Sequence, residues 1–148
     1  MKVSIRKVDS LQKEQVVLEC VTMTKEFEDI QEYVLAKGEQ LAVYQDGNRM
    51  YRIRQEDILY IEAVGELVFA YTSEQMYEMK SRLYEMEQRL LEKKFVRCSK
   101  SVILNIPKVI SIKPALNGRF LAEMENHEKI MISRQYAKNV KTCIMEEL

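Results

Sequence analysis

The segment LAVYQDGNRMYRI, residues 41–53, contains the clearest structural signal in this chain. Apolar and aromatic residues occupy both ends of the segment, and the tetrapeptide Gln45-Asp46-Gly47-Asn48 separates them. An Asp-Gly pair readily adopts the positive φ angles that a tight hairpin turn requires. The segment therefore predicts two antiparallel strands, Leu41–Tyr44 and Met50–Ile53, joined by a turn.

Short strands are predicted along the rest of the chain as well. A β-branched and aromatic run at Ile58–Ile61 precedes a turn at Val64-Gly65-Glu66 and a returning strand at Leu67–Tyr71. Asn117-Gly118 predicts a second hairpin turn. Further strands are expected at residues 95–96, 109–112, 119–123 and 129–132. Residues 76–80 fit a further strand and an extension of the following helix equally well.

Two helices interrupt these strands. Residues 81–92 repeat apolar side chains at helical spacing, and the shared face consists of Leu83, Met86, Leu90 and Leu91. Ser133 predicts the start of a final helix, whose apolar face consists of Tyr136, Val140 and either Cys143 or Ile144. Residues 41–148 are therefore expected to form a mainly β domain with two helices.

The first 40 residues predict a small ββα N-terminal appendage, residues 1–40, in front of that domain. Residues 3–8 and 15–21 alternate enough to form two strands. Thr24 then precedes an acidic first turn, which is typical of a helix N-cap, and Gly38 provides a helix end. The apolar face of this helix consists of Phe27, Ile30, Val34 and Leu35.

Composition excludes several classes of protein. A hydrophobic fraction of 47% is typical of a globular chain, and no apolar run or signal-peptide core is visible. We therefore expect a soluble, cytoplasmic protein. Three cysteines without a C-x-x-C pair and a single histidine predict neither a disulfide framework nor a zinc site, so no metal and no cofactor are expected.

The sequence motifs of this chain give no support for an enzyme. The chain has no catalytic triad context and no glycine-rich phosphate loop, so no catalytic residue is expected. Its net charge is zero, but the charges are separated along the chain. Residues 1–94 contain 14 basic and 18 acidic side chains, whereas residues 95–148 contain 9 and 5. A basic C-terminal part is compatible with one face that meets phosphate.

Three sequence blocks resemble a known family. Glu56–Ala63, Phe95–Asn105 and Ile132–Tyr136 resemble, in order and spacing, the opening, central and closing blocks of LytTR-type DNA-binding domains. The resemblance extends from about Leu41 to Ile144 and implies a bacterial transcription regulator. In that family, loops between strands enter successive major grooves of DNA. With only 40 residues before the domain, the resemblance points to a stand-alone, response regulator-like protein without a receiver domain.

The resemblance also indicates which residues contact DNA. The closing block has a DNA-contacting arginine at the position of Arg134, whose guanidinium can bind guanine O6 and N7 or a phosphate. The alternative is an ordinary exposed arginine in a first helical turn, where the helix dipole slightly disfavours a cation. Lys100 occupies a polar contact position of the central block, where a lysine would bind mainly phosphate. Asn105 resembles a structural residue.

Five further residues are candidate DNA contacts. Ser99 and Ser101 can donate hydrogen bonds to phosphates, and Ser101 could equally cap the turn that follows it. Arg97 could face phosphate or pair with an acidic neighbour. The loop of Gly65 and Glu66 is the third expected contact region, although Glu66 would repel phosphate unless it accepts a hydrogen bond from a cytosine amino group.

The expected partner is double-stranded DNA at promoter repeats, bound by a homodimer or by two copies side by side. Residues 1–40 are expected to mediate dimer or partner contact, and relatives of this kind often act beside a regulatory membrane protein encoded nearby. The alternative function is a β-rich sensor module that binds a protein or a ligand and does not contact DNA. Zero net charge and the acidic appendage suit that alternative.

Overall fold

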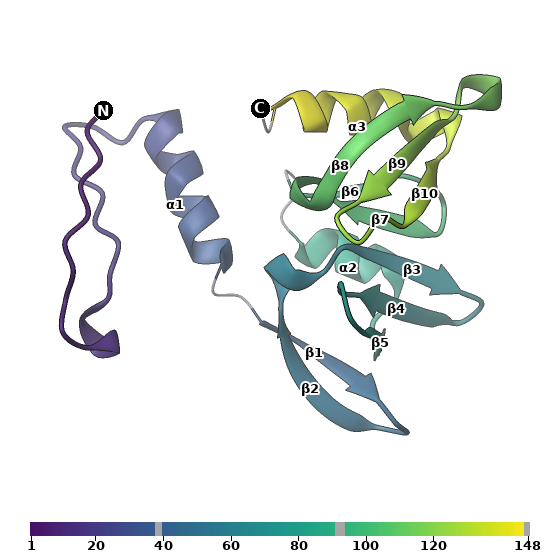
Figure 1. Cartoon of the computed structure of the whole chain (residues 1–148), viewed down its shortest axis with the longest axis horizontal. Helices are drawn as coiled ribbons and strands as arrows, with labels where there is room; N and C mark the ends of the chain where they lie inside the picture. The colour runs from purple at the N-terminus through teal and green to yellow at the C-terminus, as the bar shows by residue number, and fades with distance from the viewer. Residues whose placement is uncertain (38–39, 91–93, 147–148) are drawn as a thin grey trace. The chain divides into compact units, whose positions relative to one another are not determined.

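The computed structural model describes residues 1–37, 40–90 and 94–146 (Figure 1). The chain divides between Leu35 and Ala36 into two compact units. Within the described ranges, no helix is both long and apolar enough to cross a lipid bilayer. The expected division of roles, with dimer or partner contact in residues 1–40 and DNA binding in residues 41–148, stays a prediction.

The N-terminal unit contains a 3-10 turn, η1 (Leu11–Lys13), and most of helix α1 (Lys25–Lys37). The helix begins where the sequence predicts, because the amide of Phe27 donates a hydrogen bond to Thr24 Oγ1 at 3.4 Å. Gly38, the expected end of this helix, lies outside the described residues.

The two strands predicted for the appendage are wrong. Residues 3–8 and 15–21 form no strand and pair with none, and Val3 and Ile5 are 87% and 92% exposed. Alternating apolar residues form a stable strand only when the backbone finds ladder partners and the apolar face covers other apolar side chains. Neither segment meets that condition in this unit. The helix of the predicted ββα appendage is present, and its two strands are not.

The second unit is built on a seven-stranded antiparallel sheet with the order β2-β1-β5-β4-β3-β7-β6. The strands are β1 (Gln40–Gln45), β2 (Arg49–Arg54), β3 (Tyr60–Val64), β4 (Leu67–Tyr71), β5 (Met76–Met79), β6 (Phe95–Arg97) and β7 (Val102–Asn105). The β1–β2 hairpin forms as predicted, with φ of 51° at Asp46 and 73° at Gly47. Residues 76–79 belong to a strand, which settles the alternative left open by the sequence.

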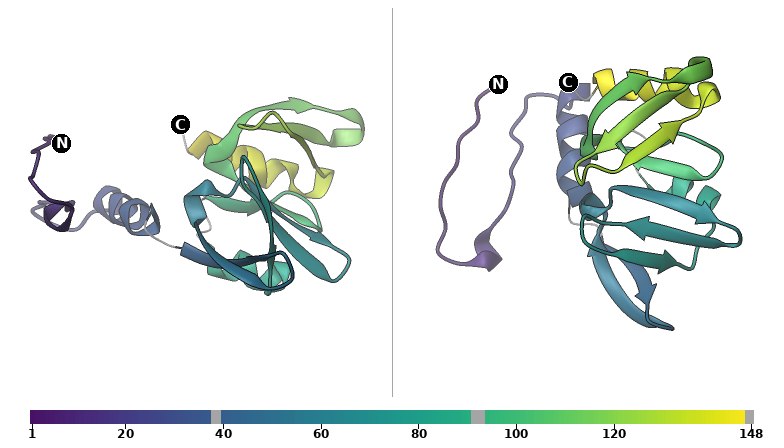
Figure 2. Two further views of the ribbon diagram at one scale, coloured as in Figure 1. Left: turned by 60° about the horizontal axis from the view of Figure 1, so that its bottom comes forward. Right: turned by 45° about the vertical axis from the view of Figure 1, so that its right-hand side comes forward.

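Helix α2 (Leu83–Arg89) covers one face of this sheet (Figure 2). Its apolar stripe is buried as expected: Leu83, Met86 and the following Leu90 pack with Ile61 and Val68 in one core. Leu91, the fourth expected member of the stripe, lies outside the described residues.

A second core of the same unit includes residues of β3, β6 and β7 and of the elements that follow β7. It is formed by the three-stranded sheet β8 (Val109–Pro114), β9 (Phe120–Met124) and β10 (Lys129–Ile132), together with α3 (Arg134–Glu146). Val140 of α3 is fully buried, while Tyr136, Cys143 and Ile144 are partly buried against this core. The mainly β domain with two helices is therefore confirmed.

Strand β7 was not predicted, although it is central to the arrangement. Its last residue, Asn105, is buried and donates through Nδ2 to the carbonyl of Ile58 at 2.7 Å. The Asn105 amide donates to the Leu59 carbonyl at 3.0 Å. Asn105 thus has the structural role expected of it, and it ties the β6–β7 hairpin to the start of β3.

Candidate nucleic-acid interface

Four chain segments meet at one edge of the second unit. Figures 1 and 2 show the β3–β4, β6–β7 and β8–β9 turns and the start of α3 on the same side. Backbone hydrogen bonds join neighbouring segments: Ala63 N donates to Ser101 O at 2.8 Å, and Ser133 N donates to Cys98 O at 2.9 Å. Ser133 Oγ donates to the same Cys98 carbonyl at 3.2 Å. We call these four segments the contact edge.

The β6–β7 turn presents Lys100 to solvent at the contact edge. The amide of Ser101 donates to Ser99 Oγ at 3.2 Å, and the two hydroxyl oxygens lie 3.5 Å apart. Both serines are half-buried, and their mutual contacts brace the turn. Because the turn is held from within, the exposed lysine projects from a fixed backbone.

Arg97 lies behind this turn and contacts two protein groups. Its Nε is 3.1 Å from Glu87 Oε2, and the Arg97 side chain is only 18% exposed. Its Nη1 donates to the carbonyl of Lys100 at 2.9 Å. Arg97 therefore pairs with an acidic neighbour, one of the two alternatives left open by the sequence, and it also supports the turn that presents Lys100.

Arg134 is the first residue of α3 and is exposed. Its backbone is placed by the preceding Ser133, whose two hydrogen bonds to Cys98 O attach the helix start to the β6–β7 turn. Lys100 and Arg134 therefore each follow closely on a residue of this hydrogen-bonded pair. A guanidinium at a helix start gains nothing from the helix dipole, so its position suits an external anion better than a stabilising role.

The β3–β4 turn is the part of the contact edge without a cation. Gly65 has a φ of +62°, and Val64 pairs with Leu67 across the turn. Gly65 and Glu66 are both exposed. This third region can therefore approach a groove closely but contributes a carboxylate, as the sequence indicated.

The same C-terminal part of the chain carries three additional exposed cations: Lys113 of β8, Arg119 of the β8–β9 turn and Lys138 of α3. Arg119 Nε donates to the carbonyl of Leu116 within the β8–β9 turn at 3.2 Å. Lys108 differs, because it lies at the opposite end of β8 and its Nζ is 3.5 Å from Glu125 Oε2. The cationic side chains near the edge are compatible with a polyanionic partner.

Cys98 supplies the carbonyl that joins two parts of the contact edge, but its side chain is fully buried. Burial raises the pKa of the Cys98 thiol to about 12, although the nearby Arg97 opposes the shift. A thiol that remains protonated at neutral pH is a poor nucleophile. The buried Cys98 thiol therefore suits a packing role better than a redox role.

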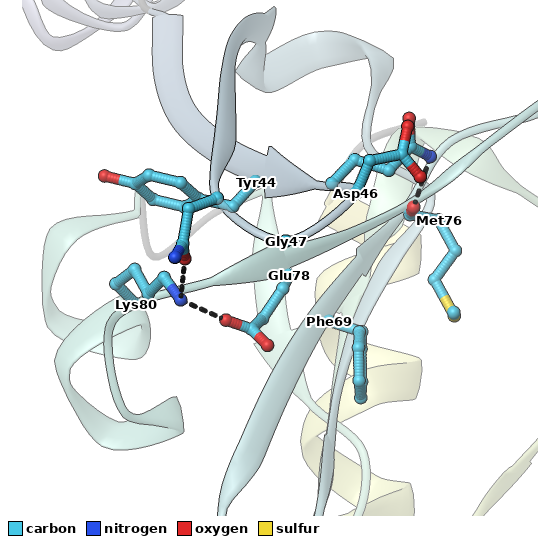
Figure 3. A pocket seen from close by; sticks show the side chains of 9 residues that line it. Tyr44, Asp46, Gly47, Phe69, Met76, Glu78 and Lys80 are labelled. Carbon is cyan, nitrogen blue, oxygen red and sulfur yellow. Dashed lines mark hydrogen bonds and ion pairs between the residues drawn. The ribbon is translucent and has the colours of Figure 1, made fainter.

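A separate cavity of about 250 Å³ lies where the β1–β2 turn approaches β5 (Figure 3). Its charged groups bind one another: Lys80 Nζ lies 2.6 Å from Glu78 Oε2, 3.2 Å from Asn48 Oδ1 and 5.1 Å from the centre of the Tyr44 ring. Across residues 1–37, 40–90 and 94–146, no cluster of three metal-ligating side chains occurs. Lys80 and Glu78 of this cavity therefore already have partners within the protein.

The family model of the LytTR DNA-binding domain matches residues 48–145. The chain belongs to the LytTR DNA-binding domain family. Membership confirms the resemblance carried by the three sequence blocks. The LytTR family is one of non-enzymatic DNA-binding regulators, as the absence of catalytic motifs in the sequence led us to expect.

Curated LytTR relatives include transcription regulators. The sensory transduction protein LytT of Enterococcus faecalis is 30% identical over 97 residues, which cover 66% of this chain and 40% of LytT. The transcriptional regulatory protein YpdB of Escherichia coli is 28% identical over 86 residues, which cover 57% of this chain and 35% of YpdB. The chain thus spans at most two fifths of the length of these relatives.

A solved LytTR structure has the same fold. It is the LytTR DNA-binding domain of a methyl-accepting/DNA response regulator from Bacillus cereus, and its TM-score against this chain is 0.67. The match covers 72% of this chain and 98% of the Bacillus cereus domain at 24% identity. The mainly β LytTR architecture is therefore the fold of the second unit.

Proposed function

We propose that this LytTR protein is a transcription regulator that binds double-stranded promoter DNA through its contact edge. The observation that carries the proposal is the pair of hydrogen bonds from Ser133 to the Cys98 carbonyl, which brings the exposed Lys100 and Arg134 to one edge. Turns held by a rigid sheet can place donors against base edges and phosphates without a recognition helix.

Each candidate residue has a distinct part in this proposal. Arg134 binds guanine O6 and N7 or a phosphate, and Lys100 binds phosphate. Ser99 and Ser101 donate to phosphates while they brace their own turn. Arg97 contributes to DNA binding indirectly, because its hydrogen bond to the Lys100 carbonyl holds the turn that presents Lys100.

The β3–β4 turn is the third contact region of the proposed interface. Gly65 allows the backbone to approach a groove closely. Glu66 accepts a hydrogen bond from a cytosine amino group, which is the arrangement that makes a carboxylate favourable beside DNA. This region contributes base preference and no phosphate affinity.

The proposal includes an assembly. A homodimer, or two copies side by side, occupies a repeated promoter site in the bacterial cytoplasm, and residues 1–40 mediate the contact between copies or with a partner. The apolar side chains exposed on residues 3–8 and 15–21 support this role, because they have no covering surface within their own unit. A membrane protein encoded nearby is the proposed restraining partner.

A mobility-shift titration at increasing salt tests the proposed function. We expect retained promoter DNA at low salt and a logarithmic loss of affinity with a slope of about −0.9 for each phosphate contact. The opposing function is a sensor that binds a protein or a ligand. That sensor would retain no promoter DNA at low salt, and this result would refute the proposal.

A further inference from the structure

Gly118, in the β8–β9 turn, lies directly under the side chain of Arg134. An ideal Cβ added to Gly118 would be 2.9 Å from Arg134 Cδ and 3.0 Å from Arg134 Cγ. A Cβ atom essentially never lies within 3.0 Å of an atom of a distant residue, so a side chain at position 118 would have to displace the arginine stem. The aliphatic stem of Arg134 therefore rests on the backbone of the turn.

The other described glycines have no comparable neighbour. Gly47 has the same φ as Gly118, +73°, yet a Cβ at Gly47 would meet no atom within 4 Å. Gly65, with a φ of +62°, also has open space. Glycine is thus favoured at position 118 for two reasons: its backbone has a positive φ, and Arg134 occupies the space that a side chain would need.

We propose that Gly118 is a positioning residue of the DNA interface: its bare backbone supports the Arg134 stem and so directs the guanidinium toward the duplex. The inference rests on the proposed function of Arg134. A long arginine side chain loses considerable rotamer freedom when it binds, and a supporting surface reduces that loss before DNA arrives. The start of α3 is already held by Cys98, so support of the stem leaves only the tip of Arg134 free to adjust.

The test compares Gly118→Ala with Gly47→Ala in the full chain. Both glycines have a φ of +73°, so both substitutions place an alanine at the same unfavourable φ, and only the first meets Arg134. The probe is a duplex selected from random sequences by the wild-type protein, and a scrambled duplex of equal length serves as the non-cognate DNA.

We expect Gly118→Ala to bind the selected duplex about ten-fold more weakly, a part of what loss of a base-contacting arginine costs. Binding to the scrambled duplex and the salt slope should not change, since Arg134 keeps its charge. Gly47→Ala should bind both duplexes like the wild type. In the Arg134→Ala background, Gly118→Ala should cause no further loss.

Gly118→Asn provides a second variant in case Gly118→Ala does not fold. Asparagine adopts positive φ more readily than alanine but still carries a Cβ. It should therefore reduce cognate binding as Gly118→Ala does, with a smaller fall in melting temperature.

Two results would overturn the inference and leave the proposed function intact. The first is wild-type cognate binding by both Gly118 variants while Arg134→Ala binds weakly. The second is an equal loss from Gly118→Ala with and without Arg134. Wild-type cognate binding by Arg134→Ala would instead refute the proposed role of Arg134, and failure to select any duplex would refute DNA binding itself.

Discussion

Arg134 and Lys100 reach the contact edge from different elements, and their side chains offer different chemistry to DNA. Arg134 presents a planar fork that can bind two acceptors of one base, whereas Lys100 presents a compact charge. The central and closing sequence blocks indicated both residues as candidate DNA contacts. The contact between the β6–β7 turn and the start of α3 could not be predicted, because it depends on hydrogen bonds between Cys98 and Ser133, which are 35 positions apart.

Arg134→Ala should weaken binding of a cognate duplex by about 1–3 kcal/mol and relax the base preference at one position. Arg134→Lys is the matched control, because it keeps the charge and loses the fork. It should keep the salt slope and lose most of the base preference. Competition binding with single-base variants of the site measures both effects, and unchanged preference in both variants would argue that Arg134 contacts no base.

Lys100→Ala should weaken binding to all duplexes by a similar factor and lower the salt slope by about one unit. Lys108→Ala is the control, because Lys108 lies at the far end of β8 and pairs with Glu125. Its slope should equal that of the wild type. Titrations at several salt concentrations measure the slopes, and equal slopes for all three proteins would remove Lys100 from the interface.

At the scale of elements, turns with strong local signals were predicted and long-range pairing was not. Asp46-Gly47 and Asn117-Gly118 revealed two hairpins, because positive φ angles favour few residue types. The β6–β7 turn is built from Ser99, Lys100 and Ser101 and has no such signal, so β7 escaped prediction. The strands expected at residues 3–8 and 15–21 failed for the opposite reason, since their alternation has no surface to cover.

The two sheets are joined by a polar contact whose removal should be measurable. Tyr60 of β3 donates its hydroxyl hydrogen to Glu128 Oε2 at 2.5 Å, and its ring stacks on Tyr71 at 4.4 Å between centres. Tyr60→Phe keeps the stack and removes the hydrogen bond. It should lower the free energy of unfolding by roughly 1–2 kcal/mol in urea denaturation. Tyr71→Phe, which loses only a 3.1 Å bond to Glu62 within one sheet, should cost less.

The same contact predicts a dependence on alkaline pH. Burial, together with the carboxylate of Glu128, raises the pKa of the Tyr60 phenol above its ordinary value of 10.0. The folded state therefore keeps this proton to a higher pH than the unfolded chain does. The contribution to stability is complete below about pH 10 and decreases as the pH rises further. Tyr60→Phe should thus lose less stability than the wild type above that pH, and parallel curves would contradict this assignment.

At the scale of the whole molecule, the separated charges of the sequence have a structural counterpart. The contact edge draws its cations from the basic part of the chain after residue 94, which explains how a protein of zero net charge can present a cationic surface. The mainly β domain followed from turn signals and apolar periodicity. The structure of the N-terminal unit did not follow from them, because the apolar side chains exposed on residues 3–8 and 15–21 have no partner surface within that unit.

A truncated chain that starts at Gly38 tests the proposed role of the N-terminal residues. Both apolar cores lie entirely in the part that remains, so the truncated protein should keep its fold. It should sediment as a monomer and bind a single half-site with unchanged affinity, while the full chain sediments as a dimer. A truncated protein that dimerised like the full chain would show that the contact between copies lies elsewhere.

The carbonyl oxygen of Cys98 accepts from both the amide and the hydroxyl of Ser133, so one atom couples the β6–β7 turn to the residue that precedes α3. The turn and the start of the helix are therefore held at a fixed separation. On a double helix, Lys100 and Arg134 would then contact positions a fixed number of base pairs apart. A promoter could differ in sequence at each contacted position, but the spacing between the two positions would have to stay constant.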